Sequence, residues 1–318
     1  MNSTIIKNLE MKILVRILGL ILFISFGNTR INAQQIAYSS PLLETHSYWN
    51  PATTAYGTKM STDGFFRGQW LGFDGAPLTG LASFQYPFVD YNMSAGGVLL
   101  FDKTGPIRNM GIQLNYAYKL KMGRESQLSL GLSGSFTQFS INTANELYND
   151  SGDIILSLAD QSTFYPSVGA GVFYVSTLEE YRSSQFYCGL AFSQAIAGQV
   201  GLDSINIKRN NHINGVLGVK IYGNSSYVEP SIQLNYVAPQ VIDGIFTLKY
   251  EMENTFWTGL SYSTVNDIGV QGGIILDRFG NRYAKLKLGV LANLLVSESI
   301  STFGSGVEFM VSYQYDLD

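Results

Sequence analysis

Few side chains in this sequence could carry catalysis. The chain has two histidines, His46 and His212, which lie far apart, and neither has a Cys or His partner spaced for zinc. A hydrolase of the Ser-His-Asp type would need one of them. Gly131–Ser135 (GLSGS) is close to G-x-S-x-G, but it ends in Ser and lies within a strand-like run instead of a strand-to-helix turn. We therefore expect no enzymatic activity and no catalytic residue.

Possible metal and cofactor ligands give no stronger signal. Asp102–Gly105 (DKTG) and Asn149–Asp153 (NDSGD) contain carboxylates, but neither follows the spacing of a calcium loop, and turn chemistry explains both. The single cysteine, Cys188, lies in an apolar run and behaves there as a small hydrophobic residue. The sequence predicts no cofactor and no bound metal.

The first residues have the features of a targeting segment. Three basic residues precede an apolar run at Ile17–Phe26: Lys7, Lys12 and Arg16. Ala33 suits the last position before a cleavage site, so we predict a secretory signal peptide over residues 1–33. An uncleaved membrane anchor is the alternative, although the apolar run is shorter than the ~20 residues of a spanning helix. Either Met1 or Met11 could start translation.

The composition suits a β-rich protein that meets two different solvents. Charged residues make up 14% of the chain and hydrophobic residues 46%, whereas average soluble domains are about 25% charged. Without residues 1–33 the chain has 16 Lys and Arg against 23 Asp and Glu, a net charge of −7. This balance argues against a nucleic-acid partner, which needs a basic surface.

Apolar residues alternate with polar or small ones along most of the chain, for example from Ile112 to Leu120 and from Val307 to Leu317. Such runs predict about fourteen strands, most of them long enough to cross a bilayer when tilted. We place them near residues 62–73, 78–88, 93–102, 110–121, 126–140, 166–175, 185–194, 212–222, 226–236, 243–251, 254–263, 268–277, 282–291 and 305–316. The predicted fold is all-β, a transmembrane antiparallel up-and-down β-barrel over residues 61–318.

The predicted connections differ in length between the two ends of the barrel. Most connections at one end are tight, whereas the three longest fall at the other: Ile141–Tyr165, Ala195–Asn211 and Ala292–Gly304. Short periplasmic turns and long outer loops are typical of outer-membrane barrels, although Ser176–Ser184 is too long for a tight turn. We expect an outer-membrane location, with Ile141–Tyr165 outside the cell.

Arg67 lies among aromatic residues in the first predicted strand. Phe66 and Trp70 share one face of this strand, and Arg67 and Gln69 share the other. An arginine facing lipid at the bilayer midplane costs roughly 2–4 kcal/mol, so we expect Arg67 to point into a polar lumen and pair there. A soluble sandwich with Arg67 on a solvated face is the alternative. Two carboxylates could face inward, depending on register: Glu229 and Glu308.

Residues 34–60 precede the first strand and show little alternation. The Asn50-Pro51 pair favours a turn, because the asparagine side chain can bond to nearby backbone and proline fixes φ. We predict that this segment either plugs the lumen or rim, or extends into the periplasm as a docking arm.

The chain resembles the PorP/SprF family of outer-membrane proteins of the type IX secretion and gliding machinery of Bacteroidetes. The matching pieces occur in order over nearly the whole mature chain: Asn50-Pro51-Ala52, Arg67, Gln69 and Trp70, Pro77 and Thr79, NYAYKL (115–120), LSLGLSGSF (128–136), YPSVGAGVFY (165–174), EPSIQLNY (229–236) and WTGLSY (257–262). Two positions depart from the family pattern. His212 is followed by Ile213 where relatives often have an aromatic residue, and the chain ends in Asp318 instead of an aromatic residue.

The resemblance implies a non-enzymatic component of the type IX secretion system that supports export or surface anchoring of a partner, such as a large adhesin, and gliding motility. It also implies periplasmic and motor components of this system as partners. A porin or a channel for solutes or hydrophobic substrates is the alternative function. Fourteen strands would leave a smaller interior than the sixteen to eighteen of open porins.

Overall fold

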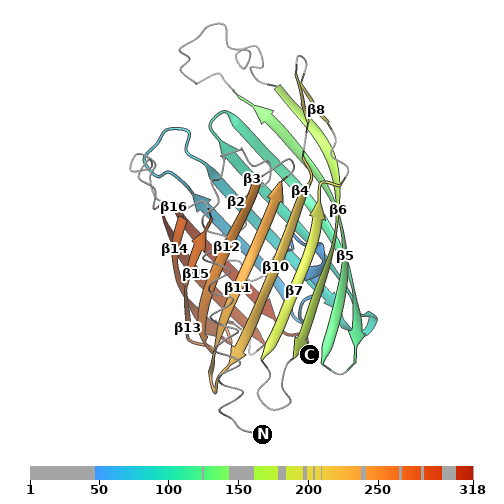
Figure 1. The fold of residues 1–318 in the computed structure, drawn as a ribbon, viewed down its shortest axis with the longest axis vertical. Helices are drawn as coiled ribbons and strands as arrows, with labels where there is room; N and C mark the ends of the chain where they lie inside the picture. Colours follow the sequence, from blue (N-terminus) through green and yellow to red (C-terminus); the bar gives the residue numbers. More distant parts are fainter. Residues whose placement is uncertain are drawn as a thin grey trace. The chain divides into compact units, whose positions relative to one another are not determined.

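In the computed structural model the chain forms a closed antiparallel β-barrel of 14 strands, which confirms the predicted fold class (Figure 1). The structure describes residues 47–123, 125–142, 161–177, 184–195, 199–202, 205–208, 210–237, 241–264, 267–280, 283–295 and 306–317. The predicted signal peptide lies outside these residues. All described residues belong to one compact unit, Gln34–Asp318.

The barrel strands run in sequence order around the wall, except that β7 pairs directly with β10. They are β1 (Met60–Gly68), β2 (Leu78–Phe88), β3 (Met93–Thr104), β4 (Ile107–Met122), β5 (Ser126–Ile141), β6 (Gln161–Thr177), β7 (Gln185–Ser193), β10 (His212–Tyr222), β11 (Ser226–Val237), β12 (Val241–Met252), β13 (Phe256–Ser263), β14 (Asp267–Asp277), β15 (Ala284–Leu295) and β16 (Gly306–Tyr315). β1 pairs with β16 and closes the barrel. A separate hairpin contains β8 (Gln199–Leu202) and β9 (Ile205–Lys208), and two short 3-10 helices are η1 (Pro51–Ala55) and η2 (Val89–Tyr91).

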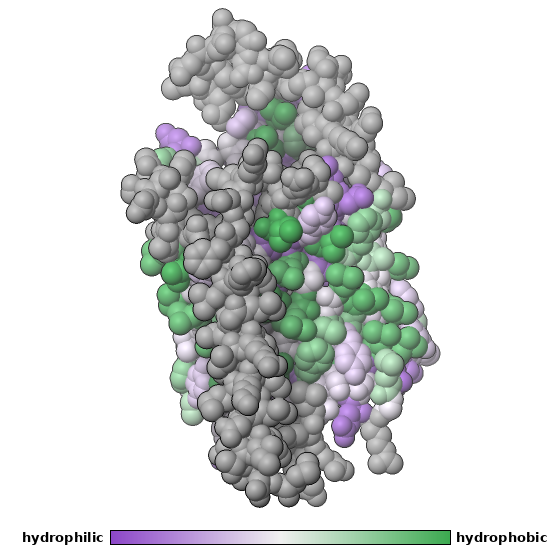
Figure 2. All heavy atoms as spheres, viewed as in Figure 1, coloured by the Kyte–Doolittle hydropathy of each residue, from purple (hydrophilic) through white to green (hydrophobic). Residues whose placement is uncertain are grey.

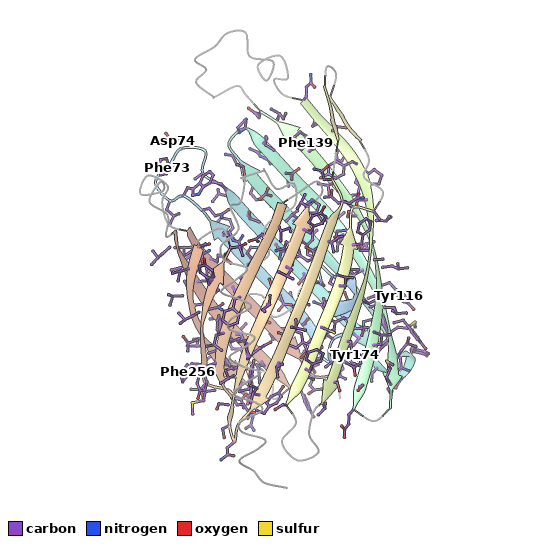
Figure 3. The ribbon with its side chains drawn as sticks, viewed as in Figure 1. Phe73, Asp74, Tyr116, Phe139, Tyr174 and Phe256 are labelled. Carbon is purple, nitrogen blue, oxygen red and sulfur yellow. The ribbon has the colours of Figure 1, made fainter. Side chains whose placement is uncertain are left out.

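The alternating sequence pattern decides which residues face outward. Leu114 on β4 is 64% exposed, whereas its neighbours Gln113 and Asn115 are buried. Figure 2 shows hydrophobic residues over the middle of the coloured part of the wall, and Figure 3 shows Tyr116 and Phe256 pointing away from it. Closure lets every strand pair on both sides, which is the arrangement that a β-structure needs in lipid. Across the described residues, no helix has the length and apolar character to cross a membrane.

The two ends of the barrel differ. At one end, hereafter the turn end, the connections 89–92, 123–125, 223–225 and 253–255 are short. At the other, the loop end, are the longest connections, residues 142–160, 194–211 and 296–305. The connection 178–184 is the long exception at the turn end. Most of the predicted Ile141–Tyr165 loop lies outside the described residues, but its last part is strand, because β6 begins at Gln161.

The predicted first strand is wrong at its end. β1 stops at Gly68, whereas we predicted a strand to residue 73. The Gln69 N–H donates to the carbonyl oxygen of Pro77 at 3.0 Å, and Trp70 adopts a positive φ of 54°, so the chain turns there. An aromatic run that reads as strand is therefore the beginning of a hairpin loop. Gln69 and Trp70 lie outside the barrel wall in that loop, and Trp70 does not share a strand face with Phe66.

Candidate functional site: a segment inside the barrel

The residues just before β1 lie in the lumen. Ser47–Gly57, hereafter the lumen segment, contains η1, whose residues contact β2, β3, β4, β5 and β6. Trp49 is only 4% exposed and packs with Phe65, Leu81 and Val98 on the inner faces of β1, β2 and β3. From Ser47 onward, the stretch between the predicted signal peptide and the barrel is thus part of the barrel interior.

Backbone carbonyls of the lumen segment bond to side chains from different parts of the wall. The Ser47 oxygen accepts a hydrogen bond from Asn115 Nδ2 on β4 at 2.9 Å. The Trp49 oxygen accepts from Ser193 Oγ on β7 and from Asn214 Nδ2 on β10, both at 3.4 Å. Since β4 and β10 are four strands apart in the barrel, the segment bridges the lumen.

Asn50 and Pro51 shape the segment locally. Asn50 Oδ1 accepts from the Ala52 N–H at 3.0 Å and caps η1, and Pro51 occupies the first turn, where no backbone donor is needed. The Asn50 Nδ2 donates to the Val172 oxygen of β6 at 3.1 Å. One side chain therefore both forms the turn and attaches it to the wall.

Three wall glycines make room for this turn. Gly131 on β5 pairs with Gly171 on β6, and Gly189 lies on the next strand, β7. A Cβ on Gly131 would overlap the backbone of Ala52, and one on Gly171 would overlap the Asn50 amide. At Gly189 a Cβ would lie 2.9 Å from Asn50 Nδ2. The lumen segment thus rests directly on the backbone of β5, β6 and β7, on a surface that we call the glycine seat.

Tyr56 anchors the other end of the lumen segment. Its hydroxyl donates to Gln185 Oε1 on β7 at 2.8 Å and accepts from Lys220 Nζ on β10 at 3.3 Å. Lys119 Nζ on β4 donates to the Gly57 oxygen at 2.9 Å. Together with the contacts of Ser47 and Trp49, these hydrogen bonds hold the lumen segment at both ends, so that it spans the lumen.

Arg67 points into the barrel and pairs with Glu308. Arg67 Nε and Glu308 Oε1 are 2.6 Å apart, and the two residues are 1% and 0% exposed. The guanidinium carbon lies 5.7 Å from the centre of the Phe65 ring, which itself packs on Trp49. The other candidate carboxylate, Glu229, also faces inward, but it accepts from the Tyr187 hydroxyl at 2.7 Å.

The predicted site residues fall into separate groups. Asn50 and Pro51 lie on the glycine seat, and Arg67 pairs across the β1–β16 seam. Thr79 is buried on β2 opposite Arg67, and its hydroxyl donates to Asp102 Oδ1 at 2.6 Å. Gln69, Trp70 and Pro77 form the loop that joins β1 to β2.

Sequence reasoning missed the glycine seat and the role of Trp49. Glycines within strands often relieve crowding or mark bends, so their presence alone does not predict a contact with another segment. A usable signal was present, because Gly131, Gly171 and Gly189 each fall on the inward face of their strand. To predict that these glycines contact the turn at Asn50-Pro51, one would also need the strand register, which the sequence does not show.

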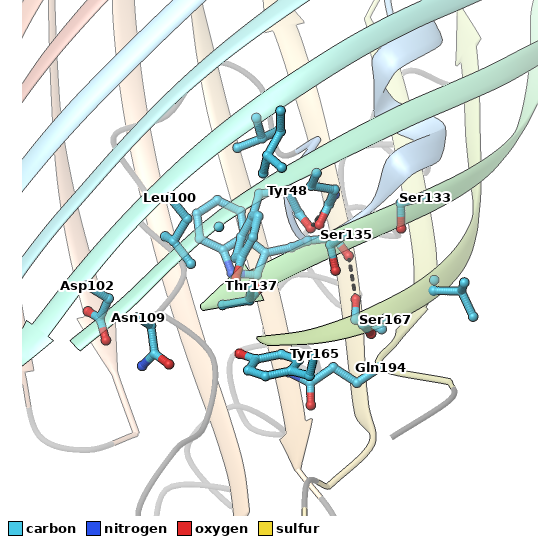
Figure 4. A pocket seen from close by; sticks show the side chains of 18 residues that line it. Tyr48, Leu100, Asp102, Asn109, Ser133, Ser135, Thr137, Tyr165, Ser167 and Gln194 are labelled. Atoms are coloured by element: carbon cyan, nitrogen blue, oxygen red, sulfur yellow. Dashed lines mark hydrogen bonds between the residues drawn. The ribbon is translucent and has the colours of Figure 1, made fainter. Parts of the chain in front are cut away.

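The lumen segment separates two spaces. Toward the loop end, a cavity of about 50 Å³ borders Tyr48 and Trp49 and is lined mainly by hydroxyl and amide side chains such as Ser135, Thr137 and Gln194 (Figure 4). Toward the turn end, a vestibule of about 780 Å³ opens between Tyr56 and the ends of the strands. In the part of the chain that the structure describes, no three His, Cys, Asp or Glu side chains are placed to hold a metal ion.

Solved structures show the same fold. The Pseudomonas putida toluene transporter TodX is 10% identical, with a TM-score of 0.54, and the match covers 86% of this chain and 94% of that one. The monoaromatic hydrocarbon channel CymD is also 10% identical, with a TM-score of 0.57 and coverage of 89% and 95%. A Pseudomonas aeruginosa FadL homologue is 9% identical, with a TM-score of 0.54 and coverage of 85% and 93%. Identities this low establish a shared barrel fold only.

Sequence comparison identifies the family. No curated protein matches the chain. The family described as "Type IX secretion system membrane protein PorP/SprF", in contrast, matches residues 31–315, nearly the whole chain. The chain therefore belongs to the PorP/SprF family of type IX secretion system membrane proteins.

Proposed function

We propose that this protein is a non-enzymatic outer-membrane component of the type IX secretion system, which supports the export or surface anchoring of a partner protein such as a large adhesin. The family match over residues 31–315 carries this proposal. The barrel fold supports a place in the outer membrane. The lumen segment supports a role other than free diffusion, because it bridges the interior from β4 to β7 and β10.

In this proposal the turn end faces the periplasm and the loop end faces outward, since outer-membrane barrels have short periplasmic turns and long outer loops. Periplasmic and motor components of the secretion machinery would then meet the turn end. The exported partner would meet the loop end, where rigid strands hold long connections of the kind that often carry binding sites.

A channel is the second candidate, because the neighbours named above include transporters and channels for aromatic hydrocarbons. Their function does not transfer at 10% identity, and the lumen segment argues against a steady open pore. Purified protein in planar bilayers separates the two functions. We expect no steady conductance from the wild type, whereas a stable ohmic pore would favour the channel.

The decisive test of the proposal is genetic. We expect deletion of the gene in its native bacterium to remove one or a few proteins from the cell surface and culture medium, as measured by quantitative mass spectrometry. Re-expression of the wild-type chain should restore them. An unchanged set of exported proteins in the deletion strain would contradict the proposed function.

A further inference from the structure

The turn-end vestibule has a charge opposite to that of the whole chain. The chain carries a net charge of −4, yet among the described residues six lysines line the vestibule against two glutamates, Glu125 and Glu251. The lysines are Lys59, Lys119, Lys121, Lys220, Lys285 and Lys287. A concave site lined by one sign of charge attracts ligands of the other sign.

Carboxylates of the protein itself neutralise only some of the vestibule lysines. Lys287 Nζ lies 3.0 Å from Glu251 Oε2, and Lys59 Nζ lies 3.0 Å from Asp316 Oδ2. Lys119 donates to the neutral Gly57 oxygen. For Lys121 and Lys285 the described residues show no ion pair. Three lysines therefore face the vestibule without a carboxylate partner within the described part of the chain: Lys119, Lys121 and Lys285.

The lysines come in pairs that repel each other. Lys119 and Lys121 are two residues apart on β4 and so point to the same side, as do Lys285 and Lys287 on β15. Side chains two residues apart on a strand are only about 7 Å apart, so like charges there disfavour the empty vestibule. A ligand with several negative charges would relieve this repulsion.

The distribution of the lysines decides what kind of anion fits. Five of them stand on β4, β10 and β15, which are separated by four, five and five steps around the 14-stranded wall, and Lys59 directly precedes β1. At about 4.8 Å per step, neighbouring lysine-bearing strands are roughly 20 Å apart along the wall. An extended chain with several carboxylates can meet lysines on all three strands at once, with one carboxylate near each.

The volume of the vestibule also suits a short polypeptide segment. The volume of about 780 Å³ is within the range of ligand sites, about 300–1,000 Å³, so it admits a short segment but no folded domain. The lumen segment borders the inner end of the vestibule through Tyr56 and Gly57, so a ligand that enters there meets the segment. Three tyrosines in its wall, Tyr56, Tyr222 and Tyr227, add hydroxyl groups beside the lysines.

We propose that the turn-end vestibule is a docking site for an acidic, extended polypeptide segment of a partner protein. This inference rests on the proposed function for its biological setting, because there the turn end faces the periplasm and meets the secretion machinery. The recognition itself depends only on the charges and shape of the vestibule.

The test uses the full-length mature protein in detergent and a short fluorescein-labelled Glu-Gly repeat peptide, with Gln-Gly and Lys-Gly peptides of the same length for comparison. Fluorescence anisotropy should show binding of the Glu-Gly peptide alone. The binding should weaken as salt rises from about 0.05 to 0.3 M, since exposed charges are screened. Equal binding of the Gln-Gly peptide would overturn the proposal.

The double variant Lys121→Gln/Lys285→Gln removes two positive charges from the vestibule. Among the described residues, neither lysine takes part in an ion pair that stabilises the wall. The double variant should weaken binding of the Glu-Gly peptide roughly tenfold. Lys103→Gln is the matched control, because Lys103 lies near the loop end of β3 on the outer face. Equal affinity in the double variant and the control would overturn the proposal, as would competition by inorganic phosphate at the same concentration as the peptide.

This experiment can fail independently of the proposed function. If the gene deletion leaves export unchanged while the double variant loses peptide binding, the proposed function is wrong and the vestibule proposal stands. If export depends on the gene but the peptide binds both variants equally, only the vestibule proposal is wrong.

Discussion

Arg67 and Glu308 face each other across the seam that closes the barrel. β1 and β16 are the first and last strands, and the two charged groups come from residues 241 positions apart in sequence. Both side chains are removed from water, so each charge depends on its partner for stabilisation. The Phe65 ring lies 5.7 Å from the Arg67 guanidinium carbon and packs on Trp49, which links the seam to the lumen segment.

Arg67→Ala should lower the free energy of unfolding by about 3–5 kcal/mol, because it leaves Glu308 buried without its partner. Arg67→Lys should be milder, since it keeps the charge and loses only the planar donor group. Denaturant unfolding followed by heat-modifiable mobility measures both effects. Arg108→Ala, at an exposed arginine on β4, is the control and should change stability little. Equal stability of Arg67→Ala and Arg108→Ala would show that the pair is not structural.

At the scale of elements, the glycine seat and the lumen segment are complementary surfaces. The turn at Asn50-Pro51 is capped by the Asn50 side chain, and the inner faces of β5, β6 and β7 lack side chains where it approaches. At Gly131 wall and segment therefore touch backbone to backbone, and at Gly171 and Gly189 the Asn50 amide lies directly on the wall. This contact explains how a segment without strand pairing stays fixed across the lumen.

Gly131→Val should displace the lumen segment, because the new side chain would occupy the position of Ala52. We expect a loss of stability of about 1–3 kcal/mol, as for overpacked cores, together with a higher conductance than the wild type in planar bilayers. Gly134→Val is the matched control on the same strand, because a Cβ at Gly134 meets nothing within 4 Å. Identical conductance in both variants would mean that the glycine seat does not hold the segment.

The same elements show what the sequence can and cannot predict. Period-two alternation placed the barrel strands well and turned Arg67 inward, since both depend on local patterns. The partner of Arg67 required the β1–β16 register, which joins the two ends of the chain. The glycine seat required the pairing of Gly131 with Gly171. The turn at Trp70 was missed because an aromatic residue with positive φ looks, in sequence, like a continued strand.

At the scale of the whole molecule, the barrel is asymmetric along its axis. The loop end has the long connections and a small, polar cavity, whereas the turn end has short connections and the basic vestibule. The lumen segment divides the two, so that each end presents its own surface. This asymmetry is what the proposed function requires, because that function places different partners on the two sides of the membrane.

The orientation of this axis can be measured with single cysteines. Cys188 lies on the outer face of β7, opposite Leu217, so Cys188→Ala gives a cysteine-free background without disturbing the lumen. In that background, Asp74→Cys reports the loop end and Glu253→Cys the turn end, and both positions are exposed. A membrane-impermeant maleimide should label Asp74→Cys on intact cells, because long loops of outer-membrane barrels face outward. It should label Glu253→Cys only after the outer membrane is permeabilised. The reverse result would place the basic vestibule at the cell surface, and its acidic partner would then have to be extracellular.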